Sequence, residues 1–105
     1  MIFELVSIED AKIHQRIVDT EDDQDVQSKV RQASAIAMQF MKRREMPDEW
    51  VETYSPAVYD IPYDVQASVL LMFGELWENR EANVATVLND AVKALLWPYR
   101  DPTMA

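Results

Sequence analysis

Five of the seven residues from Asp19 to Asp25 are acidic, which makes this segment the densest set of possible metal ligands in the chain. A calcium-binding EF-hand loop needs glycine at its sixth position and a bidentate glutamate at its twelfth. Counted from Asp19, those positions hold Gln24 and Val30. Acidic side chains are also favoured in the first turn of a helix, where they meet the positive end of the helix dipole. The acidic segment therefore predicts the start of a helix and not a metal site.

The other residues that perform chemistry in proteins are scarce. His14 is the only histidine, and zinc or di-iron motifs need more than one such ligand. The chain has no cysteine, which removes thiolate nucleophiles and thiolate metal sites. Its single glycine cannot build a glycine-rich phosphate loop. We therefore predict that the protein is not an enzyme and that it has no catalytic residue, cofactor or metal.

Length and composition favour one small acidic domain that spans residues 1–105. The formal net charge is −9, which argues against a broad surface that grips nucleic-acid phosphates. Hydrophobic residues make up 49% of the chain, enough for a real core, yet no apolar run is long enough to cross a membrane. The first ten residues lack the basic start of a secretory signal. These features are typical of an intracellular domain without a membrane association.

One glycine and five prolines favour an all-α fold. Ser7 and Thr20 have the residue types of helix caps, and apolar side chains then recur at helical spacing. Pro62 suits the first position of a further helix, and Pro98 ends the last one. The pattern predicts a small bundle of about four helices, over residues 8–17, from Thr20 to the basic cluster at 42–44, 62–80 and 84–97.

The segment between the second and third predicted helices, residues 46–61, has no helical period. It is a long aromatic-rich loop with room for a short strand pair, and it contains Trp50, Tyr54 and Tyr59. Loops of this length in compact domains are usually functional or disordered. Aromatic residues here and around a short C-terminal arm at 98–105 either bind a partner or fold back over the bundle. The sequence leaves these two alternatives open.

Three segments of the chain carry distinctive motifs in a particular order. The first is SIEDAKIHQRIVDTEDDQDV from Ser7, a short helix followed by an acidic start to a long one. The second is IPYDVQASVLLMFGELWENREAN, a proline-led apolar helix that ends in Trp-x-Asn-Arg-Glu. The third is LLWPYRDP, at residues 95–102. In their order and spacing these segments, which extend from residue 7 to residue 102, resemble the small helical family of phage head–tail connector (adaptor) proteins, of the DNA-packaging connector type.

The resemblance implies a structural virion protein at the phage neck, made in the host cytoplasm. Such subunits form a ring of about a dozen copies under the portal protein, extend the DNA channel without binding DNA specifically, and support a stopper or tail-completion protein. The C-terminal arm would dock on the portal, through Trp97, Pro98, Tyr99, Arg100, Asp101 and Pro102. Contacts with a neighbouring subunit or the next neck protein would use Asp22, Asp23, Arg43, Arg44, Trp50, Tyr54 and Tyr59.

Charge could help to join neighbouring subunits in such a ring. The acidic helix start at 19–25 and the basic cluster at 42–44 have opposite signs, as complementary patches across a subunit contact require. The competing function is a small acidic regulator, such as a DNA mimic that inhibits a nucleic-acid-binding protein. The net charge of −9 fits that function, but the acidic residues are spread over helix starts and loops and do not follow one face.

Overall fold

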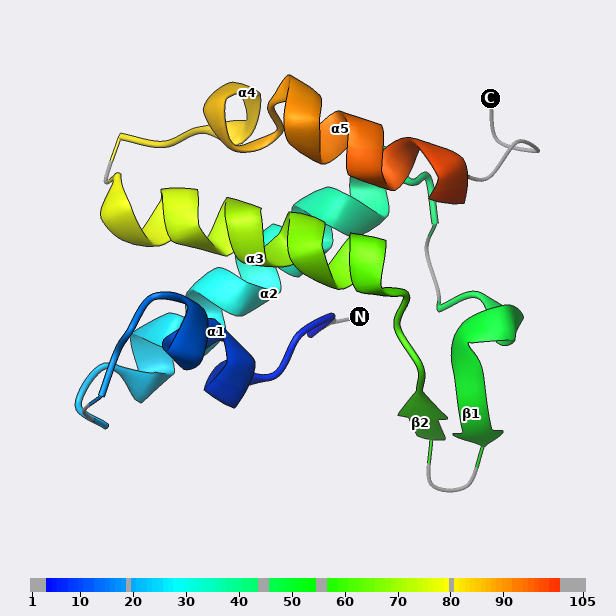
Figure 1. Cartoon of the computed structure of the whole chain (residues 1–105), viewed down its shortest axis with the longest axis horizontal. Coiled ribbons are helices and arrows are strands. Elements are labelled where there is room, and N and C mark those ends of the chain that lie inside the picture. The colour runs from blue at the N-terminus through cyan, green and yellow to red at the C-terminus, as the bar shows by residue number, and fades with distance from the viewer. Residues whose placement is uncertain (1–3, 19, 44–45, 55–56, 80, 101–105) are drawn as a thin grey trace.

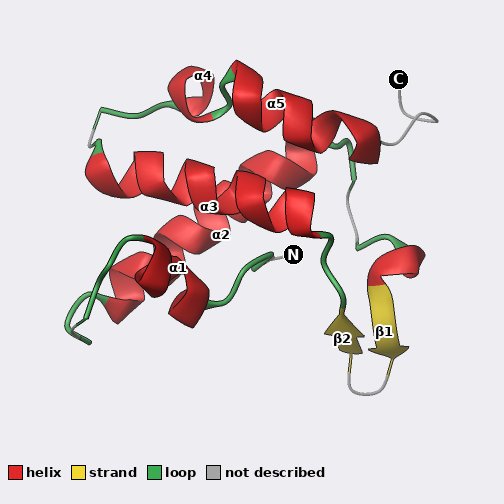
Figure 2. Ribbon diagram, viewed as in Figure 1, coloured by secondary structure: helices red, strands yellow, loops and turns green. Residues whose placement is uncertain are grey.

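The computed structural model describes residues 4–18, 20–43, 46–54, 57–79 and 81–100, with only the backbone of Tyr54, Ala57 and Ala85. The described part is mostly helical, as predicted, and it adds one small β-hairpin (Figures 1 and 2). The elements in chain order are α1 (Ile8–His14), α2 (Asp23–Phe40), η1 (Asp48–Trp50), β1 (Val51–Tyr54), β2 (Ala57–Tyr59), α3 (Tyr63–Glu78), α4 (Val84–Val87), α5 (Asp90–Leu96) and η2 (Trp97–Tyr99).

The core forms where α2 packs against α3. Apolar side chains recur every three or four residues on both helices, so each helix has one continuous apolar stripe. The stripe of α2 includes Val26, Val30, Ala33 and Ala37, and that of α3 includes Val65, Val69, Met72 and Phe73, all without exposed surface. Val92 and Leu96 of α5 close the core from a third side.

The sequence predicts the N-cap of α1 correctly but not the N-cap of α2. Ser7 caps α1 as predicted, since its Oγ accepts a hydrogen bond from the Asp10 N–H at 3.0 Å. The predicted cap at Thr20 is wrong, because the N-cap of α2 is Asp22, two residues later. Thr20 contributes its backbone carbonyl, which accepts from the Asp23 N–H at 3.3 Å. The acidic residues still occupy the first turn of α2, where the dipole favours them.

Helices α1 and α2 both stop at a residue with positive φ, namely Arg16 at 57° and Lys42 at 58°. The hydrogen bonds there follow the Schellman pattern: Ile17 N–H donates to the Lys12 carbonyl, and Arg43 N–H donates to the Met38 carbonyl. This pattern turns the chain sharply at each helix end. It explains why α1 ends at His14 and not at Ile17, and why α2 ends before the basic cluster.

The fourth predicted helix, 84–97, is two helices, and the prediction of one continuous helix is wrong. Leu88 leaves the helical conformation, with ψ of 65°, and Asn89 caps a new helix by accepting from the Val92 N–H at 3.0 Å. Asparagine competes well for a cap because its side chain satisfies a free backbone N–H. The chain then continues beyond α5 through the 3₁₀ turn η2, which contains Pro98.

The predicted long loop contains an ordered antiparallel hairpin. Strands β1 and β2 pair Val51 with Tyr59 and Thr53 with Val58, with a bulge between. The Asp60 N–H donates to the Trp50 carbonyl at 2.6 Å and closes the base of the hairpin. The short strand pair that the sequence allowed in this segment is therefore present.

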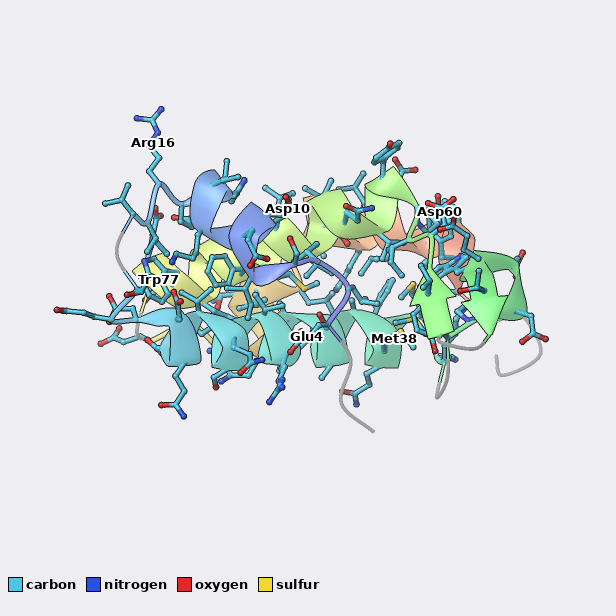
Figure 3. The ribbon with its side chains drawn as sticks, turned by 90° about the horizontal axis from the view of Figure 1, so that it is seen from below. Glu4, Asp10, Arg16, Met38, Asp60 and Trp77 are labelled. Carbon is cyan, nitrogen blue, oxygen red and sulfur yellow. The ribbon has the colours of Figure 1, made fainter. Side chains whose placement is uncertain are left out.

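The domain is flat, with extents of 39 × 34 × 22 Å. Helix α2 lies along one broad side, and α1 and α3 lie together on the other (Figures 1 and 3). The only glycine, Gly74, sits where α3 passes the end of α1. A Cβ at this position would lie 2.5 Å from Nε2 of Gln15, so glycine leaves room for the end of the Gln15 side chain.

Replacing Ser34 by alanine tests how the N-terminal segment is held. Ser34 is fully buried on α2, and its Oγ accepts from the Leu5 N–H at 3.0 Å. Ser34→Ala leaves that buried N–H without a partner, so we expect a loss of about 1–3 kcal/mol in the free energy of unfolding, measured with urea. Ser28→Ala, at an exposed position of the same helix, is the control and should cost under about 0.5 kcal/mol. Equal losses in the two variants would contradict this account.

Candidate interaction surfaces

The start of the C-terminal arm folds back onto the end of α2 and onto the base of the hairpin. Arg43, just after α2, donates through Nε to the carbonyl oxygen of Tyr99 at 2.8 Å. The Trp50 ring packs edge-on against the Tyr99 ring, with centroids 6.1 Å apart and planes at 72°. The C-terminal segment therefore meets a region that lies 56 residues earlier in the sequence at the Arg43–Tyr99 contact.

The last described residue, Arg100, adds a second set of contacts in this region. Its guanidinium group lies 5.0 Å from the centroid of the Phe40 ring and 4.7 Å from that of Trp97, in the range of cation–π contacts. The Phe40 and Trp97 rings are themselves 6.4 Å apart. We call this group the arm anchor; it comprises Phe40, Arg43, Trp50, Trp97, Tyr99 and Arg100.

Tyr99 also connects the arm anchor to the start of α3. Its hydroxyl donates to Oδ2 of Asp64 over a long 3.4 Å. Partial burial is the largest cause that raises the pKa of Tyr99 above its ordinary 10.0, followed by the negative charge of Asp64 and by this hydrogen bond. All three favour the neutral phenol, so the contact is made by the protonated side chain at neutral pH.

Some of the residues predicted to bind a partner make contacts within their own chain, whereas others are exposed. Trp50 is only 5% exposed and packs within the core, so it supports the hairpin and the arm. Trp97 is 62% exposed despite its place in the arm anchor, and Tyr59 on β2 is 42% exposed. Pro98 is exposed as well. Arg44, Asp101 and Pro102 lie outside the described residues, and Tyr54 is described only by its backbone in β1.

The acidic residues predicted for a subunit contact lie at the other end of α2. Asp22 is exposed at the N-cap, whereas Asp23 forms an ion pair with Lys12 of α1, with Nζ and Oδ1 2.6 Å apart. An open hollow of about 640 Å³ lies beside them, between the start of α2 and the end of α3. Trp77 lines it under Lys29, whose Nζ is 5.9 Å from the ring centroid. The 18 residues of α2 thus separate Asp22 and Asp23 from Arg43.

Sequence reasoning missed a set of exposed apolar side chains on α1 and α3. Ile13 is 75% exposed, Tyr63 86% and Leu71 46%. Tyr63, Ala67 and Leu71 follow each other at intervals of four residues, which places them on one face of α3. These residues recur at the same helical spacing as the buried stripe of α3, but on the opposite side of the helix.

Two kinds of site are not found in the described part of the chain. No group of three or more histidine, aspartate or glutamate side chains among those residues is arranged to hold a metal ion. Nor is any described helix long and apolar enough to cross a membrane.

Replacing Tyr99 by phenylalanine tests the electrostatics of the arm anchor. Because the folded state raises the pKa of Tyr99, it keeps the phenol proton at pH values where the unfolded chain has lost it. This contribution to stability is complete below pH 10 and disappears as the pH rises through the folded-state pKa. We expect urea unfolding from pH 8 to pH 11 to show a shallower alkaline loss of stability in Tyr99→Phe than in the unaltered protein.

Tyr63→Phe is the matched control for this prediction, because the Tyr63 side chain is 86% exposed. Parallel alkaline profiles for the unaltered protein and the Tyr99→Phe variant would contradict the assigned role of Tyr99.

Comparison with known proteins gives one finding about the family. No curated protein and no solved structure shows a significant match to this chain. The model of one family, described as "Phage gp6-like head-tail connector protein", matches residues 6–100, which include every helix and both strands described above. The match thus covers nearly the whole chain and agrees with the resemblance found in its sequence. The chain belongs to the phage gp6-like head-tail connector proteins, a family of structural virion components that act between the portal and tail proteins of a phage.

Proposed function

We propose that this connector is a head–tail adaptor that forms a closed ring under the portal, extends the DNA channel and supports the next neck protein. The ring holds about a dozen copies, the number that the resemblance to connector proteins implies. The observation that carries the proposal is the family match over residues 6–100, joined to a fold that presents separate surfaces for separate partners. A ring subunit needs at least two different surfaces for its neighbours and further ones for the proteins above and below.

The arm is the proposed contact with the portal. The arm anchor fixes the chain as far as Arg100, through the Arg43 hydrogen bond and the contacts with Phe40 and Trp97. The segment that follows therefore starts from a defined point. A fixed starting point lowers the entropic cost of placing a short segment on a partner. Trp97, with 62% of its surface exposed, adds an aromatic side chain of the kind enriched at interfaces.

The hairpin is the proposed contact with a stopper or tail-completion protein. It projects from the body of the domain (Figure 1), and Val58 and Tyr59 are each 42% exposed on β2. Asp22 and Asp23 stay proposed contributors to the contact between subunits, together with Arg44. Arg43 donates to Tyr99 within its own chain, so its proposed part in that contact depends on its remaining donors.

Native mass spectrometry of the purified protein, alone and with a portal ring, tests the proposed function. We expect either a closed oligomer of the protein alone or saturable binding of about one copy per portal subunit. A stable monomer that ignores the portal but binds a basic DNA-binding protein would reject the adaptor in favour of the acidic regulator.

Removing residues 101–105 tests the role of the arm. The arm anchor ends at Arg100, so we expect an unchanged melting temperature and portal binding weakened about tenfold or more, by titration calorimetry. A variant with the same five residues in scrambled order is the matched control for length and composition. If truncation leaves portal affinity unchanged, the arm is not the docking element.

A further inference from the structure

The two broad sides of the flat domain are formed by different helices. In Figure 3 the 22 Å dimension runs vertically, with α2 along the lower side and α1 and α3 along the upper side. The stripes of α2 and α3 that face each other are buried. The exposed stripes of these two helices therefore point in opposite directions, away from the shared core.

The exposed face of α2 is uncharged over most of its length. From Asp25 onward no acidic residue occurs until after Arg43, although the whole chain has a net charge of −9. The segment 26–43 instead carries four basic residues: Lys29, Arg31, Lys42 and Arg43. The fully exposed positions between them are small or neutral polar residues, namely Ser28, Gln32, Ala35 and Gln39. Lys29 pairs with Asp25, Arg31 pairs with Glu4, and Arg43 belongs to the arm anchor, so this face is close to neutral, whereas the remainder of the chain is strongly acidic.

The opposite face has the reverse character. Helix α3 carries Asp64, Glu75 and Glu78 and no basic residue. Its exposed stripe also contains Tyr63, Ala67 and Leu71, and Ile13 of α1 adds a side chain that is 75% exposed. Apolar surface of this kind, framed by acidic side chains, is suited to a partner that is neutral to basic.

We propose that these two faces are the two halves of the contact between neighbouring copies of this chain, so that α2 of one subunit packs on α1 and α3 of the next. The inference rests on the proposed ring and identifies its subunit contact. It differs from a contact made through the acidic and basic ends of α2, because it uses the length of the helix and not its termini.

Three properties of the domain support a second copy as the partner of each face. The faces differ and are opposite, as a head-to-tail contact that closes into a ring requires. In a ring of about twelve copies each step turns by only about 30°, so near-parallel faces fit with a slight wedge. The broad sides of the whole domain measure 39 × 34 Å with the hairpin included, which leaves room for the roughly 800 Å² per partner of a standard interface.

The charges of the two faces favour this pairing over the alternatives. The α2 face is close to neutral, because Lys29 pairs with Asp25 and Arg31 with Glu4, whereas α3 is acidic with no base, so contact between unlike faces avoids repulsion between two acidic faces. Contact between two α3 faces would instead place like charges opposite each other. The hairpin and the end of α5 lie at the margin of the flat domain (Figure 1), where they stay open to the next neck protein and to the portal.

Cross-linking is well suited to this protein because it contains no cysteine. The double variant Gln32→Cys/Ala67→Cys places one thiol on each proposed face at an exposed position. With a flexible bis-maleimide, under the conditions in which native mass spectrometry shows the oligomer, we expect a ladder of covalent species beyond the dimer. Each single variant should give almost no covalent dimer, because neither face meets itself in the ring.

The matched control is Gln32→Cys/Ala94→Cys, which moves the second thiol to an exposed position on α5. If the oligomer forms but only this control gives a ladder, or if a single variant gives cross-linked dimers, the inference about the faces is wrong while the ring stands. If no oligomer forms with or without the portal, the proposed function and the inference fail together.

A charge placed on the α2 face gives an independent readout. Ala35→Glu adds an acidic side chain that would meet the acidic α3 face of the neighbour, so we expect assembly to require about tenfold or more protein. Ala94→Glu has the same change on α5 and should assemble as the unaltered protein does. Equal assembly of both variants would overturn the inference.

Discussion

The packing of α2 on α3 is the contact on which the rest of the structure depends. The apolar stripe of α2 is made of valine and alanine, and the small side chains Ala33 and Ala37 are completely buried in it. Small side chains let two helices approach closely, which keeps the domain thin in the direction that separates them. The 22 Å thickness corresponds to two layers of helices, each about 10–12 Å across, which leaves one broad face on each side of the domain.

A thin domain of 105 residues has a limited core, so its outer segments are held by individual polar and aromatic contacts. The N-terminal segment is tied to α2 by the buried Ser34 hydroxyl. The arm and the hairpin are tied to each other through Trp50 and Tyr99. This arrangement leaves the hairpin and the arm near the bundle and places both in defined positions, as a protein that joins several partners requires.

The sequence was sufficient for the features that depend on local pattern. Helical spacing identified the buried stripes of α2 and α3, and the residue type of Ser7 identified it as a cap. The break at Leu88 was missed because the apolar spacing continues across it, and only the Asn-Asp pair at 89–90 marked a new start. Thr20 was chosen as a cap because several consecutive residues suited the role, and propensity alone does not select among them.

Contacts between distant segments were beyond the reach of sequence reasoning. The arm anchor combines Arg43, Trp50 and Tyr99, whose positions in the chain say nothing about their meeting. Their residue types suggested partner binding and folding back equally well, and the structure shows folding back for Trp50 and Tyr99. The spacing of the exposed stripe of α3 was present in the sequence. Only the fold shows that this stripe and the neutral face of α2 lie on opposite sides of the domain.

A reconstruction by electron cryomicroscopy of this protein assembled on its portal ring is the most direct test of the account. We predict a closed ring in which α2 of each subunit lies against α1 and α3 of its neighbour, with the C-terminal arms directed to the portal. Isolated copies on the portal, or a ring whose subunits meet through the hairpins or α5, would contradict it.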